Sequence, residues 1–324
     1  MSGTAMEQQT GTAALRNRAV RIHRFGGPEV LQIEDVPVPE PRDDEVVVKV
    51  VAASINPVDY KTRSGSYPAV TEDQLPVTLG RDLSGTVELL GSRAHTLKKG
   101  DPIFAMLGRD RGAYARYVLV KAVEMAAKPG NLDHIQAAAV PLAGITAWQG
   151  LFDHGGLRAG QRVLIHGGTG GVGHFAVQFA KARGATVLTT VAGDDKAFAR
   201  ELGADEAIDY KTQRFEDVAR DIDVVFDLIG GETQERSWSV LKPGGIIVST
   251  LAKPDEAKAK QHGARGTNFM ARENGEQLAE IGRLIEEGKV RPFIAGVFPF
   301  DVVQAAQSRL EQGNVPGKIV LDLR

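Results

Sequence analysis

The stretch Val163–Gly173, which reads VLIHGGTGGVG, constrains the fold of this chain more than any other segment. A short apolar, β-branched run breaks there into glycines, and apolar residues at helical spacing follow as far as Ala180. A strand, a glycine turn and a helix in this order can hold a pyrophosphate at the helix N-terminus. The stretch therefore predicts a dinucleotide-binding unit, and the plainer alternative is a glycine-rich connector in an ordinary α/β domain.

Within this stretch, three glycines stand at G-x-G-x-x-G spacing. The missing side chains of Gly168 and Gly170 let the main chain turn sharply and approach a phosphate, and Gly173 lets the helix pack closely on the sheet. The free amides of the first helical turn then face the anion. The predicted phosphate-binding residues are Gly168, Thr169, Gly170, Gly171, Val172 and Gly173.

Length and composition exclude several classes of function. A chain of 324 residues suits two domains, and its net charge of -2 offers no field for nucleic acid or an anionic membrane surface. The sequence has no apolar segment long enough to span a bilayer. It has no cysteine, which removes disulfides, thiolate nucleophiles and thiolate metal ligands, and which fits a cytoplasmic protein.

The spacing of apolar residues divides the chain. Residues 1–16 lack the apolar core of a signal peptide and are interpreted as a flexible leader. Short runs in which apolar and polar residues alternate predict a β-rich unit over 17–140, with no helix of any length before about Leu132. Strands alternating with helices over 141–289 predict a doubly wound parallel sheet, and residues 290–324 return to the β-rich unit.

Four ordered motifs carry a family resemblance. The segments SINPVDYKTRSG (54–65), GRDLSGTV (80–87) and PLAGITAWQGL (141–151), with the glycine stretch and the tail GKIVLDL, resemble the zinc-independent quinone oxidoreductase branch of the medium-chain dehydrogenase/reductase superfamily. Within that branch the pattern Asn-Pro-Val-Asp-x-Lys is most similar to enone reductases and plant-type quinone oxidoreductase homologues. The resemblance implies an α/β fold in which a GroES-like catalytic domain wraps around a Rossmann domain, with the active site in the cleft between them.

Two departures from the wider superfamily bear on metal binding. Zinc-dependent members carry Gly-His-Glu where this chain has Gly80-Arg81-Asp82, and a cysteine ligand near Asn56. The seven histidines show no paired metal spacing, so no metal is predicted. Without a Lewis acid to stabilise an alkoxide, simple alcohol oxidation is disfavoured.

The end of the second strand of the parallel sheet predicts the cofactor. An NAD-specific fold usually has an acidic residue there, whereas this chain has Ala192-Gly193, which leave room for a 2'-phosphate. By resemblance, Lys196 and Tyr210 contact that phosphate, which favours NADPH. The alternatives are a solvated lysine at 196, and a longer strand in which Asp194 or Asp195 binds the ribose of NAD.

The resemblance also implies contacts with the rest of the cofactor. Thr146 would lie against the nicotinamide, although a hydroxyl at a helix start is an equal interpretation. Ile229 and Gly230 would pass near the adenosine half and Thr250 near the carboxamide. Lys318 in the matching tail completes the predicted cofactor-binding residues.

Adding hydride to an enone β-carbon develops negative charge on the carbonyl oxygen, so a donor aimed at that oxygen is the useful catalytic group. Lys61 is the first candidate and Asn56 the second, with Tyr60 a further candidate. The plainer alternative is that Lys61 and Arg63 are exposed cations and that Asn56-Pro57 shapes a turn. Arg81 is predicted either to hold a polar substrate end or to pair with Asp82 or Asp59.

Taken together, the sequence predicts an NADPH-dependent, zinc-independent reductase of quinones or α,β-unsaturated ketones and aldehydes. Two alternatives stay open: an NADPH-binding structural or sensor protein of the same fold, and an enoyl reductase acting on a carrier-bound acyl chain. The expected partner is a small-molecule substrate, with neither nucleic acid nor membrane, and the resemblance allows a homodimer.

Overall fold

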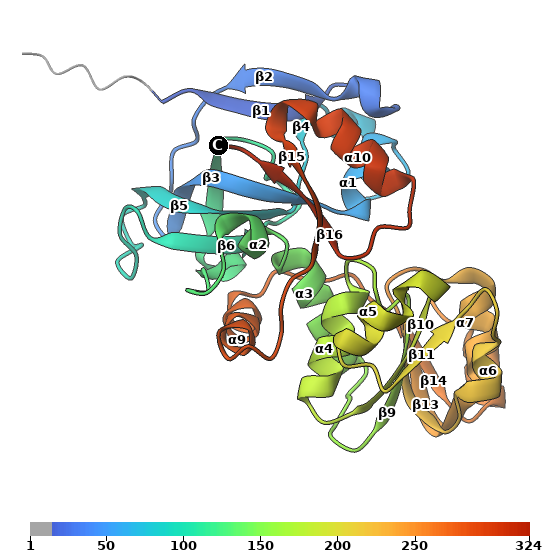
Figure 1. Cartoon of the computed structure of the whole chain (residues 1–324). Helices are drawn as coiled ribbons and strands as arrows, with labels where there is room; N and C mark the ends of the chain where they lie inside the picture. The colour runs from blue at the N-terminus through green and yellow to red at the C-terminus, as the bar shows by residue number, and fades with distance from the viewer. Residues whose placement is uncertain (1–14) are drawn as a thin grey trace, which may run out of the picture.

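The computed structural model describes residues 15–324. The leader predicted over 1–16 therefore lies, up to residue 14, outside the described residues. Figure 1 shows two packed units, a β-rich one and one built on a parallel sheet, with α3 (Pro141–Trp148) between them. The predicted boundaries after residues 140 and 289 fall close to α3 and to β15 (Ile294–Pro299), and we keep this division as a proposal.

The six-stranded parallel sheet has the order β11-β10-β9-β12-β13-β14. The chain therefore enters at the centre of the sheet and winds outward to both edges, which confirms the predicted Rossmann arrangement. Its strands are β9 (Arg162–His166), β10 (Thr186–Val191), β11 (Glu206–Asp209), β12 (Ile222–Asp227), β13 (Leu241–Ser249) and β14 (Arg265–Asn268).

Both faces of this sheet are apolar because its strands are buried on both sides. Along β9, Val163 and Ile165 join one hydrophobic cluster, whereas Leu164 joins the cluster on the opposite face. The first cluster includes residues of α3, α4 (Gly173–Ala182), α5 (Lys196–Glu201) and α9 (Gly275–Glu286). The second includes residues of α6 (Phe215–Val218), η6 (Trp238–Val240), which follows α7 (Gly231–Ser237), and α8 (Glu256–Gln261).

The β-rich unit contains a seven-stranded sheet and a three-stranded sheet. The larger sheet is formed by β3 (Glu45–Ile55), β5 (Asp82–Leu90), β6 (Pro102–Met106), β7 (Tyr117–Lys121), β8 (Met125–Ala127), β15 and β16 (Lys318–Asp322). The smaller one is formed by β1 (Asn17–Ile22), β2 (Gln32–Val36) and β4 (Val77–Thr78). The helices of this unit are α1 (Pro57–Arg63), α2 (His134–Ala138) and α10 (Val303–Glu311).

The end of the chain completes the larger sheet. Strand β16 pairs antiparallel with β3, and β15 pairs parallel with β16. Residues Ile319 and Leu321 thereby join the same core cluster as Val46 and Ile55. The parallel-sheet unit is thus an insertion in the β-rich unit, as predicted.

Helix α1 corrects the prediction that no helix precedes about Leu132. It spans seven residues, which is too short for a 3.6-residue period to be visible. Its start nevertheless has local signals: Pro57 stands at the first helical position, and the Asp59 carboxylate accepts a hydrogen bond from the Asn56 amide at 2.7 Å. Helices α6 and α8 and strand β14 are likewise absent from the elements predicted by the sequence.

Candidate active site

The glycine loop follows β9 and leads into α4, at the carboxyl end of the sheet where the strand order reverses between β9 and β12. Ligands of open α/β sheets bind at such a switch point. Gly167 makes the turn with φ +80°, a conformation that side chains other than hydrogen disfavour. Gly167 was not among the predicted site residues, because the G-x-G-x-x-G spacing starts one residue later.

Two of the predicted glycines are required by the packing of the protein itself. A Cβ atom added at Gly168 would lie 1.9 Å from Thr189 Oγ1, and one at Gly173 would lie 2.0 Å from the Gly167 carbonyl oxygen. At Gly170 the nearest atom would be 3.5 Å away, which is an ordinary contact. The absence of a side chain at Gly170 therefore has no explanation in the packing, and it leaves the main chain open to a ligand.

The amides of this loop fit an anion. In the described part of the chain, the amides of Gly171 and Val172 donate to no protein acceptor, and they lie at the N-terminus of α4. Unsatisfied amides at a helix start form a ready site for phosphate. Thr169 holds the loop from both sides: its hydroxyl donates to Asp195 at 3.0 Å, and its carbonyl accepts the Gly317 amide at 2.8 Å.

The corner after β10 is where the ribose is predicted to lie. The strand ends at Val191, so Asp194 and Asp195 stand beyond it and the longer strand of the NAD alternative is absent. Ala192 and Gly193 follow the strand and are half-buried. Lys196 begins α5 and forms no ion pair with any described residue.

Two further residues belong to the same corner. Tyr210 is 55% exposed, so its ring is accessible to a ligand. Asp209, which the sequence analysis missed, lies so close that a Cβ atom at Gly193 would be 2.8 Å from its carboxylate. Hydrogen bonds from the Lys211 amide and the Thr212 hydroxyl lower the pKa of Asp209, so this carboxylate is charged and already bound by the protein.

The loop after β12 is shaped by Asp227, which is fully buried. Its Oδ1 accepts the amides of Ile229 and Gly230 at 3.0 and 2.8 Å, and its carbonyl accepts the Thr250 amide at 3.2 Å. Ile229 is 54% exposed as a result, and Thr250 is half-buried beside the end of β13. The three predicted contact residues therefore lie together, and Asp227 is the residue that places them.

Thr146 lies in the middle of α3, which corrects the alternative that it is a helix-start hydroxyl. Its Oγ1 donates to the Leu142 carbonyl one turn earlier at 2.6 Å. Thr146 is 9% exposed, so most of its side chain is buried.

Asn56 and Lys318 meet in a buried polar cluster. The Lys318 ammonium donates to Asn56 Oδ1 and, at 3.2 Å, to the Ile55 carbonyl, while Asn56 Nδ2 donates to Asp82 at 2.8 Å. Because both ends of the Asn56 amide are engaged, only one of its N–H groups is left for a substrate. Lys318 also reaches the glycine loop, since a Cβ atom at Gly171 would lie 3.4 Å from its Cδ.

Asp59 adds a second buried carboxylate to this cluster. It accepts the Asn56 amide and the Tyr114 hydroxyl, both at 2.7 Å. Burial raises the pKa of Asp59 from 3.8 to about 6, although these hydrogen bonds oppose the shift. Burial also lowers the pKa of Lys318. The pKa of Asp59 thus lies within about one unit of neutral pH.

Lys61 and Tyr60 lie on α1, and both are half-buried. Lys61 forms no ion pair with any residue in 15–324, so its ammonium is available to a ligand. Burial and Glu311 raise the pKa of the Tyr60 phenol, which keeps it neutral. Arg63 is not the exposed cation of the plainer alternative: it is 1% exposed and donates to Gln307 and Glu311 at 2.9 and 2.7 Å.

Arg81 pairs with neither Asp82 nor Asp59, which corrects that alternative. Its guanidinium donates to Glu273 at 2.7 Å and to the Leu107 carbonyl at 2.7 Å. Arg81 directly precedes β5, so its side chain and that of Asp82 point to opposite sides of the strand. With two partners in the protein and 9% exposure, Arg81 has little freedom to hold a substrate.

Two observations concern metals and membranes. Within residues 15–324 no three or more His, Asp or Glu side chains come together in a way that could hold a metal ion. Independence from zinc stays a prediction. In the same part of the chain, none of the helices is both long and apolar enough to cross a membrane.

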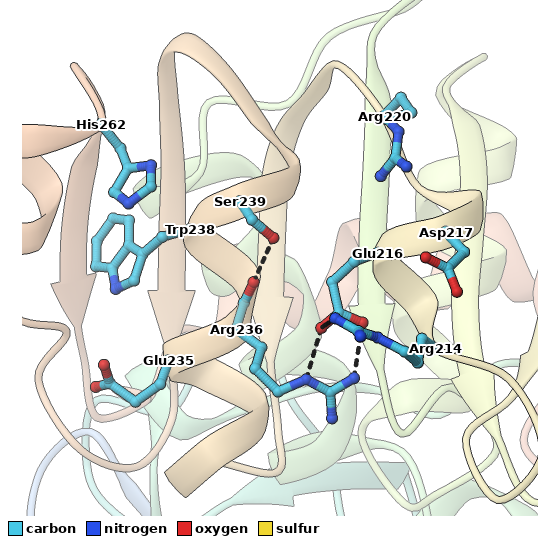
Figure 2. A pocket seen from close by; sticks show the side chains of 9 residues that line it. All are labelled: Arg214, Glu216, Asp217, Arg220, Glu235, Arg236, Trp238, Ser239 and His262. Atoms are coloured by element: carbon cyan, nitrogen blue, oxygen red, sulfur yellow. Dashed lines mark hydrogen bonds and ion pairs between the residues drawn. The ribbon is translucent and has the colours of Figure 1, made fainter.

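Two surface pockets lie away from these residues. One, of about 430 Å³, is lined by residues of α6, α7 and η6 together with Arg214, Arg220 and His262 (Figure 2). There Arg236 donates to both oxygens of Glu216 at 2.6 and 2.7 Å and lowers the pKa of that carboxyl to about 2. The other, of about 630 Å³, lies between β8 and the start of α9. Neither pocket is lined by a residue predicted to bind cofactor or substrate.

Comparison with known proteins agrees with this fold. A family described as alcohol dehydrogenase GroES-like domain matches residues 42–130, and one described as zinc-binding dehydrogenase matches residues 202–321. A quinone oxidoreductase from Coxiella burnetii has a structure that superposes with a TM-score of 0.89 at 37% identity, covering 96% of this chain and 100% of that one.

Two curated relatives are similar over most of the sequence. The 2-methylene-furan-3-one reductase of Solanum lycopersicum is 38% identical over 309 residues, which cover 92% of this chain and 76% of that protein. The chloroplastic NADPH-dependent alkenal/one oxidoreductase of Arabidopsis thaliana is also 38% identical, over 92% of this chain and 77% of that protein. The chain belongs to the medium-chain dehydrogenase/reductase superfamily, among its quinone oxidoreductases and enone reductases.

Replacing Gly173 by alanine is expected to lower the free energy of unfolding by about 1–3 kcal/mol or more, because the new Cβ overlaps the Gly167 carbonyl oxygen. Gly170→Ala is the matched control and is expected to stay within about 0.5 kcal/mol of the parent protein. Urea unfolding without cofactor measures both. Equal losses in the two variants would contradict the steric assignment.

Asp59 is expected to make stability depend on pH. Its pKa is higher in the folded protein than the ordinary 3.8, so its contribution to stability is fully present below about pH 4 and is lost as the pH rises through about 6. The free energy of unfolding of the parent protein, measured relative to Asp59→Asn, is therefore expected to fall between pH 4.5 and 7. Urea unfolding at several pH values tests this, and a difference that does not change with pH would refute it.

Proposed function

We propose that this protein is an NADPH-dependent, zinc-independent oxidoreductase that transfers hydride to a quinone or to the β-carbon of an α,β-unsaturated ketone or aldehyde. The observation that carries the proposal is the contact made by Lys318. This residue binds Asn56 beside α1, and the amide of Gly317 directly before it donates to the Thr169 carbonyl of the glycine loop at 2.8 Å. The loop suited to a pyrophosphate and the segment with the candidate donors therefore adjoin each other, as a hydride transfer requires.

The residues present fit the cofactor. The open position at Gly170 and the free amides of Gly171 and Val172 would hold the pyrophosphate. Lys196 and Tyr210 would bind the 2'-phosphate, and Thr146, Ile229, Gly230 and Thr250 would line the remainder. Bound NADPH supplies the hydride. NADPH itself is the finer part of the proposal, and the printed name of the Arabidopsis relative supports it.

The chemistry left to this chain is to orient the acceptor and to stabilise charge. When hydride adds to the β-carbon of an enone, the electron pair of the C=C bond moves to the bond between the α-carbon and the carbonyl carbon. The electron pair of the C=O bond then moves onto the oxygen, which becomes negative. An ammonium that pairs with no carboxylate among residues 15–324 is suited to that oxygen, and Lys61 is the candidate. Asn56 is the weaker candidate because both ends of its amide are engaged by the protein. Tyr60 remains a further candidate on the same helix.

Several finer points stay predictions. A homodimer is compatible with the resemblance, and a cytoplasmic location is not the only one among relatives, since the Arabidopsis protein is named chloroplastic. The two alternative functions, an NADPH-binding sensor and an enoyl reductase on a carrier-bound acyl chain, make different predictions for small acceptors. Both of these alternatives predict no turnover of free quinones and enones.

The activity is tested by mixing the purified protein with NADPH and a panel of quinones, enones and alkenals, and by following the nicotinamide absorbance. Loss of absorbance with at least one acceptor is expected. Lys61→Ala is expected to reduce kcat by about tenfold to thousandfold, the scale of one oxyanion donor, without changing the NADPH dissociation constant. Lys49→Ala, an exposed lysine on β3, is the control. An unchanged kcat of Lys61→Ala on every accepted substrate would remove Lys61 from the mechanism.

The cofactor preference is tested with Lys196→Ala. Loss of one charged contact with the 2'-phosphate is expected to reduce the ratio of kcat/KM for NADPH over NADH roughly tenfold. Lys260→Ala, an exposed lysine on α8, removes the same charge elsewhere and is expected to leave the ratio unchanged. A parent protein that strongly prefers NADH would overturn the NADPH assignment.

A further inference from the structure

Asp82, the first residue of β5, is a fully buried carboxylate that is bound by four groups from three separate segments. Its Oδ2 accepts the Ser54 hydroxyl at 2.5 Å and Asn56 Nδ2 at 2.8 Å, and lies 3.7 Å from the Lys318 ammonium. Its Oδ1 accepts the Leu142 amide at 2.6 Å. Both oxygens are acceptors only, which is the one arrangement that satisfies all of these donors.

The three segments bound by Asp82 carry the parts of the proposed site. Ser54 lies at the end of β3, and Asn56 is the residue from which α1 and Lys61 begin. Leu142 lies in the first turn of α3, whose next turn carries Thr146. Lys318 begins β16, and the Gly317 amide before it donates to the Thr169 carbonyl of the glycine loop at 2.8 Å.

We propose that Asp82 is a positioning residue that fixes α1, on the substrate side, relative to α3, on the nicotinamide side. This inference rests on the proposed function only in assigning those two sides to the two helices. Asp82 itself contacts neither substrate nor cofactor and acts through Asn56 and the Leu142 amide.

The geometry explains why a carboxylate is required. In Asp82→Asn one oxygen becomes an NH₂ group, so an N–H must face either the Leu142 amide or the Ser54 and Asn56 donors. At least one of the segments then moves away. A displacement of about 1 Å between reacting groups can cost a hundredfold in rate.

The test compares the parent protein with Asp82→Asn. Hydrogen–deuterium exchange is measured with and without NADPH. Binding of NADPH is expected to slow exchange in α3 in both proteins, and to slow exchange in α1 in the parent protein only. Persistent protection of α1 in Asp82→Asn, or none in the parent, would overturn the proposal. This readout needs no turnover, so a parent protein that reduces none of the acceptors refutes the proposed function while the exchange result still decides the role of Asp82.

Kinetics give a second readout. The kcat of Asp82→Asn, calculated per NADPH-binding site, is expected to fall at least tenfold because hydride transfer becomes slower. For the same reason, the kinetic isotope effect measured with NADPH deuterated at C4 is expected to rise. An unchanged isotope effect with kcat within about twofold of the parent would contradict the positioning role. Counting sites by NADPH titration separates this effect from partial unfolding.

Two further variants keep the test decisive. Ser54→Ala removes one donor and leaves the carboxylate in place, and is expected to lower kcat roughly threefold with α1 protection reduced. If Asp82→Asn does not fold, Ser54→Ala takes its place in the test. A kcat and an α1 protection equal to those of the parent protein would then count against the proposal. Asp101→Asn is the matched control and is expected to behave like the parent, since within the described part of the chain its carboxylate accepts only the Lys98 amide, at 2.9 Å.

Discussion

The pairing of β16 with β3 is the interaction on which the site depends. It brings Leu321 opposite Ala53 and Ile319 opposite Ile55, and so closes the β-rich unit after the parallel-sheet unit has been inserted. The same strand delivers Lys318 to Asn56. Since the residue before Lys318 also binds the glycine loop, one short strand aligns the two units at the point where chemistry is proposed.

That alignment requires charges to be buried. Asp59, Asp82 and Lys318 are at most 3% exposed, and they form a cluster of two carboxylates and one ammonium. Removing one partner from such a cluster leaves another charge uncompensated, which typically costs about 3–5 kcal/mol. The raised pKa of Asp59 shows that its hydrogen bonds do not fully offset the desolvation. The cluster is therefore better explained by placement of the site than by stability.

The parts of the fold that could be predicted from sequence are those with local signals. Apolar spacing and glycines within one short stretch predict the β9 strand, the glycine loop and α4. Helix α1 was missed because seven residues are too few for a period, and Arg63 was taken for a possible surface cation because its partners Gln307 and Glu311 lie far along the chain. The Arg81–Glu273 pair and the contacts of Asp82 were not predicted for the same reason: their partners lie far apart in the sequence, and no local pattern encodes such a contact.

Helix α1 is held at both ends by the last segment of the chain. At its start Asn56 is bound by Lys318 of β16, and near its end Arg63 is bound by Gln307 and Glu311 of α10. The strands of the parallel sheet, by contrast, are complete once Asn268 has been made. During synthesis, the cofactor-binding unit therefore has all of its strands before α1 gains its contacts with Lys318, Gln307 and Glu311, and these late contacts complete the fixing of the helix that carries Lys61.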